Sequence, residues 1–463
     1  MQVPHNDAQA LFFEGNRAWS AGDLERAEAC YRKAIAFSPD LAEAHANLGF
    51  VLDRRNAIEA ADASYRRAIA IDPRLAPVLR NYGAFLMKHR RFEDAERALR
   101  ESIRLDSQAP ATWSNLGVLL ACVKREAEAE QCHRAAIALD AGDAIARFNL
   151  SYLLLRQARF EEGWACLDAG KSHQPRLPAP RCPRWRGEAL AGRRILIEFE
   201  AGHGDMIQFC RYARVLNSQG ARTVAMVCHP ALKSLFSTLA GIDELYAIDE
   251  AIPVEPWDYW TPLLSIPHHC KTDLTRIPDS IPYLVPAPDR IARWSGLLPD
   301  HGIRVGLAWK GNANFENDAE RSLSGIRDLA PLWSVPGVTL ISLQKGAGQD
   351  EAAHPPAGQA IVDLGPSLHD FHDTAAVVKQ LDLVISVDTA VAHLAGAVGT
   401  ACWILLPDFK TDWRWMTGRD DSPWYPGIVR LFRQQHAGDW TPVVARVREQ
   451  LQRFAAAQCE RAS

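Results

Sequence analysis

The sequence lacks the patterns that mark several common classes of protein. Its ten cysteines are scattered from Cys30 to Cys459 without a Cys-x-x-Cys pair, which argues against a disulfide framework or a structural zinc site. No stretch approaches the roughly 20 apolar residues of a membrane span, and the N-terminus has no basic or apolar leader segment. The formal net charge of −4 gives no support for nucleic acid as the main partner. We therefore expect a soluble, cytoplasmic protein without membrane insertion.

The composition is that of a globular protein with several domains. The chain has 463 residues, of which 48% are hydrophobic and 23% are charged. This length is enough for two to four domains with cores of their own.

A 34-residue period runs through the first third of the chain. The motif Asn47-Leu48-Gly49 returns in recognisable form at residues 81–83, 115–117 and 149–151, and other positions recur with the same period: Tyr31, Tyr65, Leu99 and His133, and Ala27, Ala61, Ala95 and Ala129. Small residues such as Gly49 and Ala61 allow two antiparallel helices to cross closely, and each pair must stack on the next to bury its apolar face. The pattern resembles the tetratricopeptide repeat family. It predicts an all-α solenoid over residues 1–170, with units near 8–39, 42–73, 76–107 and 110–141 and a degenerate fifth unit near 144–169.

One polar position of the repeat suggests a binding face. Asn47, Asn81, Asn115 and Asn149 share this position, so stacking should place them as a ladder along the concave groove. A side-chain amide both donates to and accepts from a peptide backbone, which suits capture of an extended protein segment. The alternative is that this Asn only supports packing between repeats, and both interpretations are open.

The chain changes character after the repeats. Four prolines and four arginines between Lys171 and Arg186 predict a linker over residues 171–192, because proline at this density cannot continue a helical solenoid. Apolar runs that read as strands then alternate with helical patterns, at 194–199, 223–228, 243–248, 259–264, 304–309, 338–343, 383–387 and 403–406. This alternation predicts parallel sheets with crossover helices, in two Rossmann-like halves over residues 193–288 and 289–463.

The stretch from Leu383 to Ala397 is the most informative part of the second half. A buried strand ends at Ser386-Val387, the pair Asp388-Thr389 follows, and a helix rich in small residues begins at Ala390. Such a turn lies at the carboxyl ends of parallel strands, where open α/β sheets bind ligands. The N–H groups and the positive end of the helix dipole favour phosphate there.

Several motifs together resemble the bacterial heptosyltransferase-like glycosyltransferases of the GT-B fold, joined here to tetratricopeptide repeats. They are Gly202-His203-Gly204-Asp205 and Asp388-Thr389-Ala390-Val391-Ala392-His393, with Trp309-Lys310-Gly311-Asn312, Arg321-Ser322, Ser342-Leu343-Gln344-Lys345-Gly346, Asp412-Trp413-Arg414-Trp415 and Ser422-Pro423-Trp424-Tyr425-Pro426 between and after them. The resemblance covers essentially the whole chain. It implies a multidomain protein, with the all-α solenoid followed by an α/β GT-B fold that binds acceptor in its first half and donor in its second.

The resemblance also implies the chemistry and the roles of the residues. The family moves a sugar from a nucleotide sugar with inversion, without a metal or a cofactor, and its base is the Asp of the Gly-rich turn, which is Asp205 here. A helix N-cap is the other role open to Asp205, and His393 is either a ligand contact or a histidine tucked against the sheet. The expected donor-binding residues are Lys310, Asn312, Arg321, Ser322, Gln344, Lys345, Asp388, Thr389, Ala390 and His393. The expected acceptor-binding residues are the ladder at Asn47, Asn81, Asn115 and Asn149, with Gly202, His203 and Gly204.

The sequence leaves the substrates open. His203 replaces the apolar residue usual in relatives and Ala201 stands where Gln is common, so acceptor contacts near Asp205 differ. The repeats favour a protein acceptor, such as flagellin or another surface protein by analogy with the family. A lipid or polysaccharide acceptor and a non-catalytic scaffold are the alternatives. ADP-heptose and a CMP-linked nonulosonic acid both remain as donors, while the donor of the protein O-GlcNAc transferases does not carry over. A homo-oligomer is also open.

Overall fold

The chain forms two compact units in a computed structural model that describes residues 4–170, 180–254, 256–278, 280–355 and 359–462. The first unit comprises residues 1–153 with 169–171, and the second comprises residues 154–168 with 172–463. The first nine residues of the expected linker, with Pro175, Arg176 and Pro178, lie outside the described residues. No helix among the described residues is both long and apolar enough to cross a membrane.

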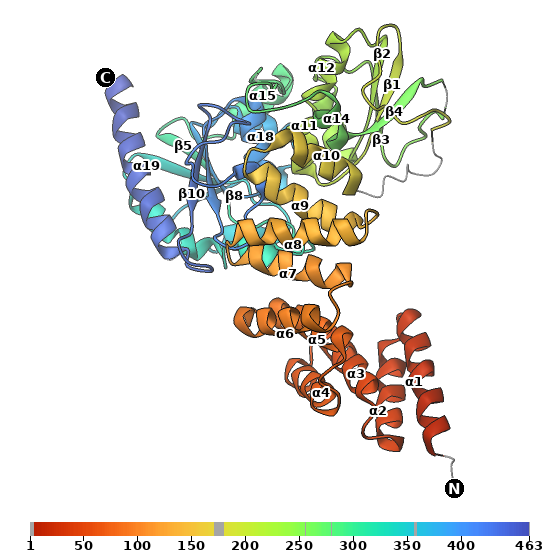
Figure 1. Ribbon diagram of the computed structural model, residues 1–463. Helices are drawn as coiled ribbons and strands as arrows, with labels where there is room; N and C mark the ends of the chain where they lie inside the picture. Colours follow the sequence, from red (N-terminus) through yellow and green to blue (C-terminus); the bar gives the residue numbers. More distant parts are fainter. Residues whose placement is uncertain (1–3, 171–179, 255, 279, 356–358, 463) are drawn as a thin grey trace. The chain divides into compact units, whose positions relative to one another are not determined.

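The repeat array consists of paired helices with the predicted period (Figure 1). The helices are α1 (Pro4–Ser20), α2 (Leu24–Phe37), α3 (Ala42–Arg54), α4 (Ile58–Ile71), α5 (Ala76–Lys88), α6 (Phe92–Leu105), α7 (Pro110–Cys122), α8 (Glu126–Leu139), α9 (Ala144–Arg156) and α10 (Phe160–Gly170). This confirms the predicted all-α repeat architecture.

One glycine in each of the first four pairs lets the two helices approach closely. An added Cβ would lie 2.6 Å from the Tyr31 ring at Gly15, 3.0 Å from the Tyr65 ring at Gly49, 2.6 Å from Leu99 at Gly83 and 2.6 Å from the His133 ring at Gly117. Tyr31, Tyr65, Leu99 and His133 are each 1% exposed or less. The recurring glycine and the recurring bulky residue are therefore two sides of one contact, which explains why both follow the 34-residue period.

An arginine at the turn of two pairs also links neighbouring repeats. Arg91 binds Asp62 of the preceding repeat at 2.9 Å and Asp94 of its own helix at 2.7 Å. Arg125 makes the equivalent contacts with Glu96 at 2.8 Å and Glu128 at 2.7 Å. These pairs are partly exposed and screened by solvent, so the apolar contacts between stacked helices contribute the larger part of the stability.

The second unit contains two fully parallel sheets. The first sheet is formed by β1 (Arg194–Glu198), β2 (Thr223–Cys228), β3 (Glu244–Ala247) and β4 (Tyr259–Pro262), in the order β3-β2-β1-β4. Its helices are α11 (His203–Phe209), α12 (Tyr212–Ser218), α13 (Pro230–Phe236) and α14 (Ile266–His269). The chain reverses direction across the sheet between β1 and β4, which places a crevice at the carboxyl ends of these two strands.

The second sheet has the order β10-β9-β8-β5-β6-β7. Its strands are β5 (Ile303–Ala308), β6 (Val338–Ser342), β7 (Val362–Asp363), β8 (Leu383–Val387), β9 (Cys402–Leu406) and β10 (Val429–Arg433). In chain order this is the 3-2-1-4-5-6 arrangement of doubly wound α/β sheets. The reversal falls between β5 and β8, which pair from Val305↔Leu383 to Ala308↔Ser386.

Helices surround this sheet and complete its core. They are α15 (Pro288–Ser295), α16 (Asp318–Arg321), α17 (Phe371–Val378), α18 (Ala390–Val398) and α19 (Thr441–Ala462). Apolar residues of α19, among them Val443, Val447 and Leu451, are fully buried with the side chains of β5 and β8. The helix at the end of the chain is therefore part of the core of the second sheet.

Within the second unit, aromatic residues of α10 pack against the segment that follows β9. Trp164 of α10 is 1% exposed and donates from Nε1 to the carbonyl of Thr272 at 3.1 Å. Its ring lies edge-on to Trp413 at 5.3 Å and to Trp424 at 6.3 Å. Phe160, one turn earlier, is 6.1 Å from Trp424. An aromatic cluster thus joins α10 to the segment after β9.

Strand positions agree with the sequence prediction except at two edge strands. All eight predicted strands form within one or two residues at their starts. The sequence analysis missed β7, which has only two residues, and β10, where Arg430 and Arg433 interrupt the apolar pattern. Trp185, in the described part of the linker region, is 1% exposed and its backbone N–H donates to the carbonyl of Trp260 at 2.7 Å.

His133 makes the repeat array sensitive to acid. Burial lowers the pKa of this imidazole to about 4, and its Nδ1 has no hydrogen-bond partner. As the pH falls below 6.5, His133 is protonated in the unfolded chain, but in the folded array it stays neutral down to about pH 4. The free energy of unfolding should therefore fall by up to about 3 kcal/mol between these two pH values. His133→Leu, which copies Leu99 of the preceding repeat, should remove this dependence and raise stability at every pH.

Denaturant unfolding followed by circular dichroism at pH 7.5 and pH 5 would measure the effect. His436→Leu is the control, because His436 is exposed. An unfolding profile of His133→Leu with the same pH dependence as the unaltered protein would contradict the assignment.

Candidate functional site

Two turns that are far apart in the sequence meet at the carboxyl ends of the two sheets. The first follows β1 and leads through Gly202 into α11, and the second follows β8 and leads through Asp388-Thr389 into α18. Gly204 is the point of contact, since an added Cβ there would lie 2.8 Å from Cδ2 of His393 and 3.6 Å from Cα of Ala390. Only a residue without a side chain allows the two turns to pack this closely.

The Gly-rich turn fixes the orientation of Asp205. Gly202 is the N-cap of α11 and its N–H donates to Oδ2 of Asp205 at 2.9 Å. Ala201, just before it, has a left-handed backbone with φ of +66°, a conformation that costs a non-glycine residue about 1 kcal/mol. Asp205 is therefore not the N-cap itself: it lies in the first turn of α11, and one carboxylate oxygen accepts from the N–H of the N-cap residue.

The other oxygen of Asp205 faces an arginine from the opposite sheet. Arg414 donates to Oδ1 of Asp205 and to Asp412 at 2.9 Å, and its Nε donates to Gln208 at 2.6 Å. Its side chain is 7% exposed, and its guanidinium lies 4.5 Å from the ring centre of Trp413. Arg414 therefore bridges the two halves of the α/β unit directly beside the expected base.

Asp388 carries a carboxylate in an unfavourable environment. Desolvation and the nearby Asp412 raise its pKa to about 6, while the charges of Arg321 and Arg414 act in the opposite direction. A carboxylate that is kept partly desolvated between other charges is typical of binding and catalytic sites. The structure thus gathers Asp388, Asp412, Arg321 and Arg414 around the N-terminus of α18.

Arg321 lies at the same edge of the second sheet. Its Nε donates to Asp318 at 3.1 Å, and its guanidinium stacks over Phe315 with 4.5 Å to the ring centre. An added Cβ at Gly311 would lie 2.7 Å from the guanidinium, so this glycine makes room for it. Arg321 is partly buried, and its contacts with Asp318 and Phe315 fix the orientation of its guanidinium.

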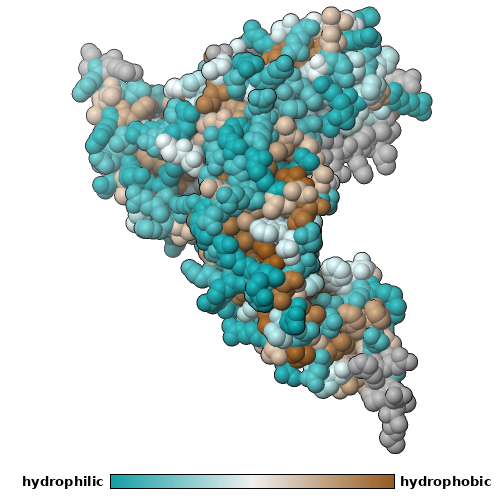
Figure 2. Space-filling model, in the orientation of Figure 1, coloured by the Kyte–Doolittle hydropathy of each residue, from teal (hydrophilic) through white to brown (hydrophobic). Residues whose placement is uncertain are grey.

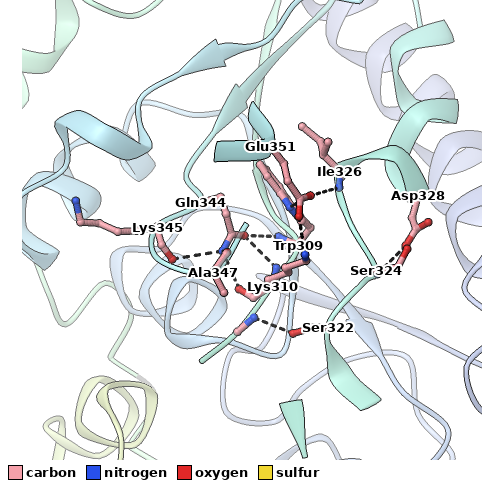
Figure 3. Close-up of polar contacts among 11 residues, drawn as sticks. Trp309, Lys310, Ser322, Ser324, Ile326, Asp328, Gln344, Lys345, Ala347 and Glu351 are labelled. Atoms are coloured by element: carbon pink, nitrogen blue, oxygen red, sulfur yellow. Dashed lines mark hydrogen bonds and ion pairs between the residues drawn. The ribbon is translucent and has the colours of Figure 1, made fainter. Parts of the chain in front are cut away.

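Gln344 and Ser322 support the loop after β5, as Figure 3 shows. Gln344 is 2% exposed; its side-chain oxygen accepts from the N–H groups of Trp309 at 2.8 Å and Lys310 at 3.0 Å, and its amide donates to the carbonyls of Lys310 and Ala347. Ser322 accepts from the N–H of Gly311 at 2.9 Å. Gln344 thus uses its side-chain amide within the protein, and its contact with the donor stays a prediction.

Lys310 is also engaged within the protein. Its ammonium group binds Oε1 of Glu351 at 2.5 Å, and Oε2 of the same carboxylate accepts from Trp309 Nε1 at 3.0 Å and from the N–H of Ile326 at 2.7 Å (Figure 3). The Lys310 charge and these hydrogen bonds hold the pKa of Glu351 below its usual value against desolvation. Glu351 therefore links Lys310, Trp309 and Ile326. The sequence did not indicate this role, because Glu351 stands in no motif.

His393 is a neutral, packed histidine. Burial lowers its pKa to about 3, its Nδ1 lies 2.9 Å from the hydroxyl of Tyr425, and its ring stacks on Trp415 at 5.2 Å. Of the two roles considered, the structure favours packing against the facing turn over contact with phosphate. At this pKa the imidazole is neutral near pH 7.

The remaining predicted residues occupy different places around the turns. Thr389 is the N-cap of α18 and its hydroxyl lies 3.0 Å from that of Ser386. His203 packs on His229 at 4.1 Å between ring centres, and desolvation lowers its pKa to about 4. Asn312 and Lys345 are exposed. The roles of these side chains in ligand binding stay predictions.

The Asn ladder belongs to the repeat array and is partly exposed throughout. Asn47 donates to Asn16 at 2.9 Å, and Asn81 accepts a long contact of 3.4 Å from Arg80. The side chain of Asn47 thus makes a hydrogen bond within the array. Figure 2 shows apolar surface among the polar surface of the repeat helices. Exposed side chains there include Ile145 and Tyr152 on α9, which also carries Asn149.

Asp388 gives a test of the site that needs no ligand. Because its pKa is raised in the folded state, folding is favoured when the carboxyl is protonated and is penalised as the pH rises above the unfolded value of 3.8 toward about 6. Asp388→Asn should therefore raise the free energy of unfolding by about 1 kcal/mol or more at pH 8, with a smaller gain at pH 5.

Urea unfolding at both pH values would measure the gain. Asp350→Asn serves as the control, because Asp350 is an exposed aspartate of the same unit. Loss of stability in Asp388→Asn at pH 8 would contradict the raised pKa.

Known proteins match parts of the chain. Models of the tetratricopeptide repeat match residues 15–54, 42–75 and 86–144. Protein FlbA of Caulobacter vibrioides is 30% identical over 335 residues, which are 65% of this chain and 54% of FlbA, so the chain spans about half the length of that relative.

Solved structures are similar to about a third of the chain. That of pilF from Pseudomonas aeruginosa is 27% identical, covers 37% of this chain and 80% of its own, and has a TM-score of 0.35. That of YrrB, described as a TPR protein with an unusual peptide-binding site, is 23% identical, covers 35% of this chain and 84% of its own, and has a TM-score of 0.30. The matched models and the observed helix pairs show that the N-terminal array consists of tetratricopeptide repeats.

Proposed function

We propose that this protein is an inverting glycosyltransferase of the GT-B type, which moves a sugar from a nucleotide sugar to a hydroxyl group of a protein held by the repeats. The observation that carries the proposal is the meeting of the two turns at Gly204. It brings a carboxylate of the first sheet, Asp205, to the edge where the second sheet collects Asp388, Arg321 and the N-terminus of α18.

The expected reaction is a single displacement. The acceptor hydroxyl oxygen forms a bond to the anomeric carbon, and its proton passes to the carboxylate of Asp205. The bond between the anomeric carbon and the phosphate oxygen breaks, and its electron pair leaves with the nucleotide. Arg321 and the N–H groups at the start of α18 would stabilise the charge that develops on the phosphate.

The order of the strands supports placing the donor in the second sheet. The chain reverses between β5 and β8, and doubly wound sheets bind nucleotides in the crevice at this reversal. The loop after β5 carries Gly311 and Arg321, and the turn after β8 carries Asp388 and Thr389. Gln344, Ser322 and Glu351 then act as supports that hold the loop after β5 in place.

The repeat array supports a protein as the acceptor. Stacked repeats of this family present a long concave face, and the partly exposed Asn side chains at one repeat position suit backbone recognition. The similarity to FlbA extends beyond the repeats, because 335 aligned residues exceed the length of the array. The combination of array and α/β unit is thus shared with a relative of greater length.

Nucleotide binding is the first test of the proposed function. The purified full chain should bind at least one of ADP, GDP, UDP and CMP in isothermal titration calorimetry, and Arg321→Gln should weaken this binding about tenfold or more through loss of a charge-assisted contact. Arg327→Gln is the control, because Arg327 is an exposed residue of the short helical segment Ile326–Ser334, which follows the same loop. Failure of all four nucleotides to bind would refute the proposal.

Asp205→Ala tests the chemistry. Transfer to candidate acceptor proteins, followed by intact mass, should fall by about a hundredfold or more because the base is lost. Nucleotide binding should persist. Asp300→Ala, which alters an exposed aspartate between α15 and β5, should transfer normally. Unchanged transfer by Asp205→Ala would rule out this base.

The ladder has a separate test. Replacing both Asn81 and Asn115 with Ala should weaken acceptor capture about thirtyfold and leave nucleotide affinity intact, since two backbone contacts of about 1 kcal/mol each are lost. These two rungs are preferred because Asn47 is tied to Asn16. Gln108→Ala, in an exposed turn of the array, is the control. Equal loss of acceptor and nucleotide binding would show that the array is structural.

A further inference from the structure

We propose that Arg414 is shared between Asp205 and the phosphate groups of the donor, so that donor binding withdraws Arg414 from Asp205 and makes this carboxylate a stronger base. The inference rests on the proposed function, because it requires a nucleotide at the N-terminus of α18. It assigns to Arg414 a role that the sequence did not suggest: the residue couples occupancy of the donor site to activation of the base.

The contacts of Asp205 leave its basicity dependent on Arg414. One carboxylate oxygen accepts from the N–H of Gly202 at 2.9 Å, and the other faces the guanidinium. Both contacts stabilise the ionised form, and the cation is the stronger of the two. A base in this state accepts a proton poorly, so full activity requires that the cation be drawn away or turned toward another anion.

Arg414 is placed to serve such an anion. It belongs to the segment Asp412–Trp415, between β9 and β10 of the second sheet, yet it reaches across to Asp205 and Gln208 of α11. Its positive charge acts on Asp388 and on His393, which lie at the start of α18 and in its second turn. The guanidinium thus lies within electrostatic range of the place where the phosphate is expected.

Several carboxylates compete for the positive charge of Arg414. From the second sheet it is faced by Asp412 and Asp388 and by Arg321, while His393 is neutral. From the first sheet it is faced by Asp205, and Arg211 is buried against Tyr283 and the carbonyl of Trp424. The carboxylates Asp205, Asp388 and Asp412 outnumber the cations Arg321 and Arg414 beside them. A phosphate that enters must therefore compete for these cations.

The surroundings of Arg414 fit a guanidinium that exchanges one anionic partner for another, rather than a fixed ion pair. The guanidinium lies 4.5 Å from the ring centre of Trp413 and 5.5 Å from that of Phe209. Such faces hold the side chain in place while leaving its N–H groups able to change partners, because the attraction to a ring does not depend on one donor. Asp412 keeps a bidentate contact at 2.9 and 3.0 Å and anchors one end of the fork.

A double-mutant cycle on nucleotide affinity tests the sharing of Arg414 directly. Asp205→Asn keeps the shape of the side chain and its bond to Gly202 but frees Arg414, so the full chain should bind the tightest nucleotide of the ADP, GDP, UDP and CMP panel about fivefold more tightly. In the Arg414→Gln background the same change should give no gain. Arg414→Gln alone should bind more weakly than the unaltered protein.

The cycle separates sharing from general charge repulsion. If Asp205 only repels phosphate at long range, the gain from Asp205→Asn persists with Arg414→Gln, and the inference is overturned. Asp318→Asn is the matched control, because Asp318 pairs with Arg321 and its effect should be the same in both backgrounds. Arg414→Lys keeps the charge without the fork; if Arg414→Gln does not fold, a gain from Asp205→Asn that shrinks in Arg414→Lys supports sharing, and an undiminished gain opposes it.

The outcomes distinguish the inference from the proposed function. Absence of nucleotide binding in the unaltered protein and in Asp205→Asn alike refutes the proposed function and the inference with it. Nucleotide binding with additive effects of the two changes refutes the inference alone. Loss of the gain in the Arg414→Gln background establishes the coupling.

Discussion

The absence of a side chain at Gly204 is the constraint on which the site depends. Any Cβ there would collide with His393, and the turn after β1 would be forced away from the N-terminus of α18. Burial at this contact, together with the positive charge of Arg414, outweighs the Asp205 carboxylate and keeps His393 neutral, with its Nδ1 beside the hydroxyl of Tyr425. Two buried arginines then bridge the same junction from opposite sides, Arg414 toward Asp205 and Arg211 toward the carbonyl of Trp424.

The architecture could be predicted from the sequence because its signals are local and repeated. A 34-residue period fixes the helix pairs, and Gly83 with Leu99 shows how one glycine and one bulky residue create each crossing. The strands of the α/β unit are apolar runs such as Leu383–Val387, which are buried on both faces and therefore lack polar interruptions. The strand β10 was missed because its two arginines break that pattern at the edge of the sheet.

The candidate site could be predicted only in part. Asp205, Arg321 and Asp388 stand in motifs, so the sequence indicates them individually. The pairing of Asp205 with Arg414 joins residues 209 positions apart, and no periodicity carries such information. Gln344 follows a strand, where ligand contacts are common, and its amide oxygen accepts from the backbone N–H groups of Trp309 and Lys310, which no sequence motif indicates. A polar residue at the right edge of a sheet can support the site without touching what binds there.

The most direct test of the account is a crystal structure of the full chain with a bound nucleotide. The account predicts that the phosphate lies at the N-terminus of α18, within hydrogen-bond distance of the N–H groups of Thr389 or Ala390 and of the guanidinium of Arg321 or Arg414. Asp205 should face the sugar side of the nucleotide across the contact at Gly204. A nucleotide bound away from the carboxyl ends of β5 and β8, with Arg321 and Arg414 unmoved and distant, would contradict it.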